Sequence, residues 1–168
     1  KKWIQQYHED KTKLEKRPKG LWITGKSRSG KTSLLTLLGN YSYFKNIWNA
    51  LNFSNEDSYN IMDDFELTFE KPVDLSFYKA WIGSQKVTTI TDKYVRKMEI
   101  YNGKPLIWIN NNRFEDQVQF PSCRRYIKEN MTIIELGEDD LYTPKNRSTP
   151  KNTWFCNNII TKELEETT

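Results

Sequence analysis

Short apolar runs recur along the chain and alternate with helical patterns. Apolar runs bounded by turn residues are typical of buried strands, whereas apolar positions spaced three or four residues apart are typical of helices. A parallel sheet is expected where strands and helices alternate, and ligands bind at the carboxyl ends of its strands. The fold class that we predict is therefore α/β, with a central parallel sheet flanked by helices. The predicted strands cover residues 21–24, 41–44, 59–64, 94–101, 105–110 and 132–136, and the predicted helices cover residues 2–16, 31–38 and 75–82.

The two ends of the chain differ from its middle. Residues 2–16 fit a short amphipathic helix, which ends at Arg17-Pro18 because the residue before a proline avoids the helical conformation. Residues 142–153 are rich in Pro, Asn and Thr, a composition that predicts a mobile tail. We expect a helical N-terminal segment over residues 1–19, one core domain over residues 20–137 and a flexible tail over residues 138–168.

The composition predicts a soluble domain of a reducing compartment. Of the 168 residues, 36% are hydrophobic and 14% are aromatic, which is enough for a sizeable core. No apolar run approaches the roughly 18 residues that span a bilayer, and no signal segment is recognisable. Two cysteines, Cys123 and Cys156, have no metal-ligand spacing, and a single histidine, His8, argues against a zinc site. The chain begins at Lys1 rather than Met, so we expect a fragment of a longer polypeptide.

The first chemical motif is a glycine-bracketed loop between a predicted strand and a predicted helix. A loop of this kind lets backbone N–H groups surround the phosphates of a nucleotide. Lys31 would reach the β and γ phosphates of ATP, and the Thr32 hydroxyl would bind Mg²⁺. The expected ATP-binding residues are Gly25, Lys26, Ser27, Arg28, Ser29, Gly30, Lys31 and Thr32.

Two further motifs follow at the ends of apolar strands. The run over residues 59–64 ends in Asp63 and Asp64, so that Asp63 can join Thr32 in a Mg²⁺ site while Asp64 orients and deprotonates the attacking water. The run over residues 106–109 is followed by three asparagines, of which one can place a neutral amide at the γ-phosphate. Paired acids and consecutive asparagines also occur in ordinary polar turns, and that alternative stays open.

The order of these motifs resembles the superfamily 3 helicase domain of replication initiator (Rep) proteins from circular single-stranded DNA viruses, most closely those of genomoviruses and geminiviruses. The resemblance extends over about residues 20–136 and includes Trp81-Ile82-Gly83-Ser84-Gln85 and Gly103-Lys104-Pro105-Leu106. It implies an AAA+-type P-loop NTPase core that assembles as a homo-oligomer, a hexameric ring around single-stranded DNA, in the host cell nucleus. It also assigns the γ-phosphate amide to Asn111, with Asn110 as the alternative. These initiators carry a histidine-metal nicking domain that contacts origin DNA, and we expect that domain to be missing from this chain.

A basic segment is the candidate DNA-binding element. The net charge of +4 permits a polyanionic partner without demanding one. The Asn102-Gly103 pair predicts a turn between strands 94–101 and 105–110, and in a ring this hairpin would point into the pore. An ordinary solvated ribbon is the alternative. The expected DNA-binding residues are Lys93, Tyr94, Arg96, Lys97, Tyr101 and Lys104.

The function that we predict is an ATP-hydrolysing helicase motor that moves on single-stranded DNA in rolling-circle replication. The resemblance suggests Arg124 or Arg125 as an arginine finger that acts on the nucleotide of a neighbouring subunit. An assembly module with little turnover and a DNA-packaging or transposition ATPase stay open as alternatives. A small-molecule kinase would also use the loop, but the arginine-rich lid of such enzymes is not recognisable.

Overall fold

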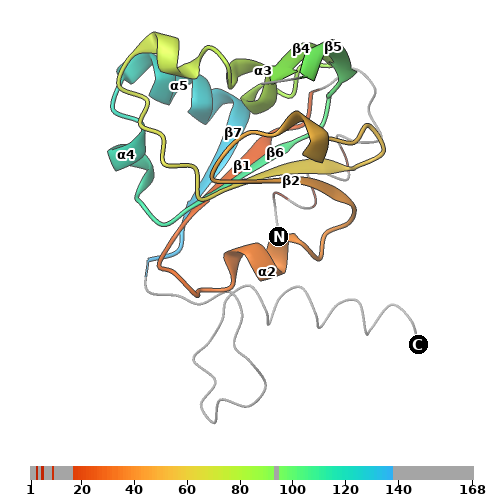
Figure 1. Cartoon of the computed structure of the whole chain (residues 1–168). Coiled ribbons are helices and arrows are strands. Elements are labelled where there is room, and N and C mark those ends of the chain that lie inside the picture. The colour runs from red at the N-terminus through yellow and green to blue at the C-terminus, as the bar shows by residue number, and fades with distance from the viewer. Residues whose placement is uncertain (1–2, 4, 6–8, 10–16, 93–94, 138–168) are drawn as a thin grey trace, which may run out of the picture.

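The computed structural model describes residues 17–92 and 95–137, together with positions 3, 5 and 9. This part of the chain folds into a central sheet with further elements on both of its faces (Figure 1). No helix within it is long and apolar enough to cross a bilayer. The elements in chain order are β1 (Gly20–Thr24), α2 (Lys31–Leu35), β2 (Tyr41–Lys45), η1 (Ala50–Asn52), β3 (Tyr59–Asp63), η2 (Pro72–Leu75), α3 (Lys79–Ile82), β4 (Val87–Asp92), β5 (Val95–Tyr101), β6 (Leu106–Asn110), α4 (Phe114–Gln117), α5 (Pro121–Asn130) and β7 (Met131–Glu135).

The central sheet has five strands in the order β2-β3-β6-β1-β7, and every neighbouring pair is parallel. This confirms the predicted α/β fold class. Because all five strands run the same way, their carboxyl ends lie along one edge of the sheet. Strand β1 lies between β6 and β7, so the segments that leave β6 and β7 flank the loop that follows β1.

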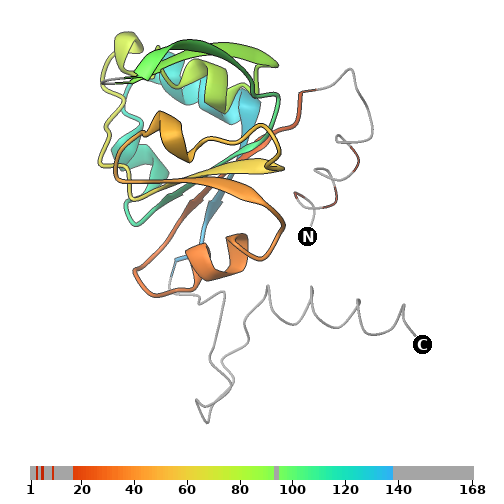
Figure 2. The same cartoon turned by 45° about the vertical axis from the view of Figure 1, so that its right-hand side comes forward.

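Successive side chains of each strand point to opposite faces of the sheet, so the core is divided into two clusters, one on each face. Leu21, Ile23 and Ile107 point to one face and pack with Leu35 of α2. Trp22 and Trp108 point to the other face, where their rings stack at 4.8 Å between neighbouring strands. Figures 1 and 2 show α2 below the sheet, and α3, α5 and the two-stranded sheet of β4 and β5 above it.

The helix after the glycine loop is shorter than predicted. Residues 31–38 were expected to be helical, whereas α2 ends at Leu35 and Leu37 is 80% exposed. The buried Tyr59 hydroxyl donates to the carbonyl oxygens of Leu35 at 2.7 Å and of Gly39 at 3.1 Å. The first bond satisfies the Leu35 carbonyl, which a helix continued past Leu35 would have used, and the second holds Gly39, where the chain turns toward β2.

The predicted turn at Asn102-Gly103 does not join two paired strands. Strand β5 pairs antiparallel with β4, which the apolar pattern did not reveal, and β6 pairs in the central sheet. Asn102 is only 3% exposed, and its side-chain oxygen accepts a hydrogen bond from the Asn60 amide at 2.9 Å. The Asn-Gly pair is therefore a buried connection between the two sheets rather than a hairpin turn.

Two helical predictions also need correction. Of the helix expected over residues 75–82, only α3 is α-helical, because Pro72 and the Asp74 carboxylate start a separate 3-10 turn, η2, that ends at Leu75. Helices α4 and α5 were not predicted: α4 is only four residues long, and the apolar face of α5, which includes Cys123 and Ile127, is narrow within a polar sequence. The predicted helix over residues 2–16 lies mostly outside the described residues, although positions 3, 5 and 9 are helical. The predicted tail over residues 138–168 lies wholly outside them.

Candidate nucleotide-binding site

The three sequence motifs lie together at the carboxyl edge of the sheet. The glycine loop leaves β1, the acidic pair ends β3, and the asparagines end β6. Neighbouring strands hold them in place, because the Gly25 N–H donates to the Asn110 carbonyl at 3.3 Å and the Asp64 N–H donates to the Ile109 carbonyl at 3.2 Å. The chemistry of this edge therefore comes from segments as far apart in the chain as Gly25 and Asn110.

The loop between β1 and α2 leaves its backbone donors available. Arg28 and Gly30 have positive φ angles, 63° and 85°, which curl the backbone. Among the described residues, the backbone N–H groups from Ser27 to Gly30 have no acceptor. Gly25 lies so close to β7 that an added Cβ would be 2.9 Å from the Cβ of Leu136. A turn of free N–H groups of this kind suits an anion.

Lys31 lies beneath this loop and is 6% exposed. Its ammonium group donates to the Gly25 and Lys26 carbonyls at 2.8 Å each and to the Asn111 side-chain oxygen at 3.1 Å. Burial lowers the pKa of Lys31, while the nearby charges of Asp63 and Asp64 oppose this shift. No ion pair joins Lys31 to either carboxylate within the part of the chain that the structure describes.

Asp63 is 4% exposed and accepts two hydrogen bonds on the same oxygen, Oδ2. The Thr32 hydroxyl donates at 2.9 Å, and the Tyr43 hydroxyl donates at 2.6 Å. Burial, followed by the hydrogen bond to Asp63, raises the pKa of Tyr43. Tyr43 was not among the predicted site residues, since nothing in the sequence indicates that the strand of Tyr43 pairs beside the strand of Asp63.

The donor set of Thr32 and Asp63 fits a hard divalent cation. A hydroxyl and a carboxylate oxygen that lie 2.9 Å apart are ligands of the kind that Mg²⁺ takes together with water and phosphate oxygens. Among the described residues, no group of three or more His, Cys, Asp or Glu side chains could hold a metal by itself.

The remaining polar residues of the edge divide into buried and accessible ones. The Asn110 amide is 5% exposed, donates to the Phe65 carbonyl at 3.0 Å, and accepts from the Asn111 and Asn112 N–H groups at 2.6 and 3.0 Å. Asn111 is exposed and contacts Lys31, so of the two candidate asparagines it is Asn111 that faces the loop. Asp64 is half-buried and has a left-handed φ of 55°.

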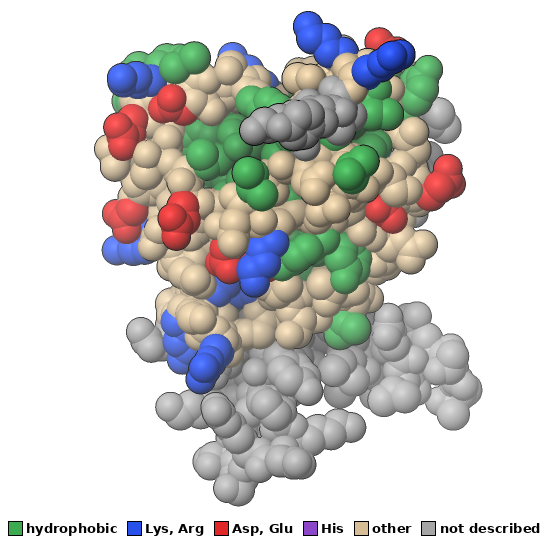
Figure 3. Space-filling view, viewed as in Figure 1, with side chains coloured by type: hydrophobic (Ala, Val, Ile, Leu, Met, Phe, Trp, Pro, Cys, Tyr) green, Lys and Arg blue, Asp and Glu red, His purple; other side chains and the backbone are tan. Residues whose placement is uncertain are grey.

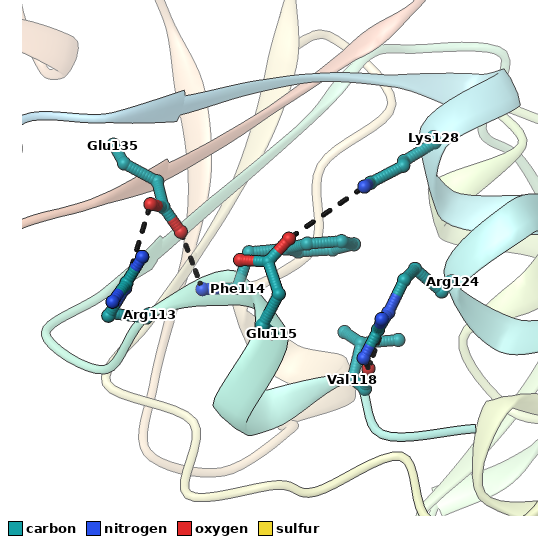
Figure 4. A network of polar contacts seen from close by, with 7 residues as sticks. All are labelled: Arg113, Phe114, Glu115, Val118, Arg124, Lys128 and Glu135. Atoms are coloured by element: carbon teal, nitrogen blue, oxygen red, sulfur yellow. Dashed lines mark hydrogen bonds and ion pairs between the residues drawn. The ribbon is translucent and has the colours of Figure 1, made fainter. Parts of the chain in front are cut away.

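The two candidate finger arginines lie on α5 and differ in their contacts, and Figure 4 shows Arg124. The Arg124 guanidinium donates to the Val118 carbonyl through Nε at 3.1 Å and Nη2 at 2.8 Å. Arg125 is exposed, and no contact of its side chain with another described residue is found. Arg124 thus fastens α5 to the end of α4, whereas Arg125 is available to a neighbouring molecule.

A second network holds α4 in place beside β7 (Figure 4). The Glu135 carboxylate accepts from the Phe114 N–H at 3.0 Å and lies 3.8 Å from the Arg113 guanidinium. Lys128 of α5 lies 3.7 Å from the Glu115 carboxylate. Because Arg113 follows β6 and Glu135 ends β7, this ion pair links the two strands on either side of β1.

The predicted DNA-binding residues do not form one patch. Lys93 and Tyr94 lie outside the described residues. Arg96 and Lys97 are exposed on β5, and strand alternation directs them to opposite faces. Tyr101 is 67% exposed on the same face as Lys97, about four residues or roughly 13 Å away. In Figure 3 basic side chains lie over β4 and β5 at the top right, and others lie near the loop before α2 at the lower left.

Lys104 lies apart from this surface. It is half-buried, its ammonium group donates to the Ser54 carbonyl, and it is 4.7 Å from the centre of the Phe53 ring. Burial lowers the pKa of Lys104, although Asp57 and Glu56 raise it. These contacts attach the start of β6 to the segment before β3.

Comparison with known proteins identifies the relatives of this α/β P-loop domain. No protein-family model matches the chain. The replication-associated protein of Miscanthus streak virus (isolate 91) is 30% identical over 125 residues, which are 73% of this chain and 34% of that protein. The replication-associated protein of Bean yellow dwarf virus is 32% identical over 143 residues, which are 84% of this chain and 41% of that protein.

A solved structure has a similar fold. The apo C-terminal region of NrS-1 (residues 305–718) matches 93% of this chain and 38% of its own with a TM-score of 0.55 and 18% identity. The chain spans between a third and about two-fifths of the length of the curated relatives given above. The chain is a homologue of the replication-associated (Rep) proteins of geminivirus-like single-stranded DNA viruses, which confirms the resemblance inferred from its motifs.

Proposed function

We propose that this chain is the ATP-hydrolysing helicase motor of a viral rolling-circle replication initiator, and that it moves on single-stranded DNA as an oligomeric ring. The observation that carries the proposal is the meeting of three motifs at one sheet edge. Lys31 contacts Asn111, and Thr32 contacts Asp63. These contacts support a single site in which groups that would bind phosphate, bind a metal and orient water act together.

Each group has a role that follows from its chemistry. The free N–H groups of the loop and the Lys31 ammonium would bind the phosphates of ATP, while Thr32 and Asp63 would hold Mg²⁺. Bound Mg²⁺ supplies positive charge that stabilises the phosphates during transfer. Asp64 would accept the proton of the attacking water, and the neutral Asn111 amide would orient that water.

The partners of the motor are part of the proposal. The names of the relatives support a role in DNA replication. Lys97, Arg96 and Tyr101 of β5, with Lys93, Tyr94 and Lys104, are the proposed contacts to single-stranded DNA. Residues 1–19 are the proposed oligomerisation segment, and the origin-nicking domain and the host nucleus come from the family resemblance.

Two substitutions separate binding from hydrolysis. Lys31→Ala should weaken the binding of labelled ATP, whereas Asp64→Asn should retain that affinity and lower phosphate release by on the order of 10²-fold, as expected for loss of a general base. Asp116→Asn, on the exposed surface of α4, is the matched control and should hydrolyse ATP at the wild-type rate. Phosphate release is measured with and without Mg²⁺ and single-stranded DNA.

One result would contradict the motor, and another would contradict only the role of Asp64. Wild-type protein that binds ATP and assembles without turnover would instead be the assembly module considered above. Unchanged hydrolysis in Asp64→Asn would remove Asp64 from its proposed role while leaving ATP binding in place.

A further inference from the structure

A short polar contact at the candidate site involves a residue that none of the motifs contains. The Tyr43 hydroxyl donates to Asp63 Oδ2 at 2.6 Å, and Thr32 donates to the same oxygen at 2.9 Å. Asp63 is buried, and a buried carboxylate needs hydrogen-bond donors to remain ionised. Among the described residues, the hydroxyl groups of Tyr43 and Thr32 are the two side-chain donors to Asp63.

The register of the sheet explains how Tyr43 reaches this oxygen. Strand β2 pairs with β3 so that Tyr43 is opposite Ile61 and Lys45 is opposite Asp63. Asp63 is therefore two residues further along the neighbouring strand, roughly 7 Å from the level of Tyr43. A phenol side chain is long enough to span that distance when it leans along the strand.

The position of the Asp63 carboxylate has a chemical consequence. Lys31 is close enough for the charges of Asp63 and Asp64 to raise its pKa, yet no ion pair joins them among the described residues. If the Asp63 carboxylate turned to Lys31, each charge would neutralise the other, and neither would be available to a bound nucleotide. The bond from Tyr43 holds the carboxylate beside Thr32 and away from the lysine.

We propose that Tyr43 is a positioning residue, which holds Asp63 in the orientation needed to receive a divalent cation with Thr32. The proposal rests on the function proposed above. It extends the candidate site to β2, the edge strand of the central sheet, which carries none of the three motifs.

The test compares Tyr43→Phe with Tyr41→Phe. Tyr41 is the matched control because it is on the same strand and, by alternation, on the same face as Tyr43. Its ring packs on Tyr59, and no hydrogen bond from its hydroxyl to a described residue is found. Each substitution removes one hydroxyl group and keeps the aromatic ring. Affinity for labelled ATP is measured with Mg²⁺ and with a chelator, and Mn²⁺ binding in the presence of ADP is followed by electron paramagnetic resonance.

We expect Tyr43→Phe to reduce the Mg²⁺-dependent gain in nucleotide affinity by on the order of tenfold, the effect of one lost hydrogen bond to a charged group. Affinity in the chelator should stay within about twofold of wild type. Mn²⁺ binding should weaken in parallel. Tyr41→Phe should match wild type in all three measurements.

The outcomes separate the inference from the proposed function. If wild-type protein shows no Mg²⁺-dependent nucleotide binding, the proposed function fails. If it does and Tyr43→Phe behaves like Tyr41→Phe, the positioning role alone is wrong. If Tyr43→Phe weakens binding equally with Mg²⁺ and with chelator, and also lowers the apo unfolding temperature, Tyr43 supports the fold rather than the orientation of Asp63.

Discussion

Replacing Lys104 with methionine decides between two roles for this residue. The sequence predicts that Lys104 contacts DNA, whereas in the structure its ammonium group bonds the Ser54 carbonyl and lies over the Phe53 ring. Methionine keeps most of the aliphatic stem and removes only the charge and its donors. A change in stability would therefore report on these two contacts.

The magnitude follows from the contacts themselves. A hydrogen bond from a charged group contributes about 1.5–3 kcal/mol, and a cation over an aromatic ring in a partly exposed site contributes about 0.5–1 kcal/mol. Burial of the ammonium opposes both, as the lowered pKa of Lys104 shows. We expect Lys104→Met to lower the free energy of unfolding by about 1–2 kcal/mol after this offset.

Urea unfolding measures this loss as a shift of the midpoint at unchanged slope. Lys97→Met is the control, because Lys97 is exposed on β5 and its loss should leave the midpoint unchanged. Binding of single-stranded DNA is measured for both variants over a range of salt concentrations. A contact with phosphate should reduce the salt slope by roughly 0.7. Wild-type stability of Lys104→Met, together with a reduced salt slope, would refute the structural role.

Two pairs of neighbours provide further predictions. Asn110→Ala should lower the free energy of unfolding by about 2–4 kcal/mol because it breaks one buried and two partly buried hydrogen bonds, whereas Asn111→Ala should unfold like wild type and release phosphate more slowly. Thermal unfolding and phosphate release check both, and equal destabilisation would contradict this division. Arg124→Ala should lower stability by about 1–2 kcal/mol through its lost bonds to Val118. Arg125→Ala should leave stability unchanged and lower ATP turnover, with recovery when it is mixed with Lys31→Ala chains; turnover that is unchanged would exclude Arg125 as the finger.

The three inner strands of the central sheet were predictable because each is a short run of buried residues. In β1, β3 and β6 every residue is buried, which is the pattern of a strand covered on both faces. Strand β4 was missed because only one of its faces packs on the protein. Ile90 is buried, whereas Val87 is 42% exposed, and threonines separate them.

The prediction of a hairpin turn at Asn102-Gly103 failed for a different reason. An Asn-Gly pair between two apolar runs favours a hairpin when the runs pair with each other. Here β6 fits between β1 and β3, where it buries both of its faces, and so it cannot also pair with β5. Burial of a whole strand on both faces outweighs a local turn preference.

At the candidate site, some contacts could be predicted from the order of the motifs, whereas others depend on the register of the strands. Parallel strands place their carboxyl ends at one edge whatever their register, so the meeting of Lys31 with Asn111 and of Thr32 with Asp63 could be predicted from motif order. The bond from Tyr43 to Asp63 depends on the register between β2 and β3, because a shift of one residue would direct Tyr43 to the opposite face. Register is set by packing across the whole sheet. Residues that act through a neighbouring strand are therefore the ones that a motif does not reveal, and Tyr43 is the residue at this site for which the structure adds a role.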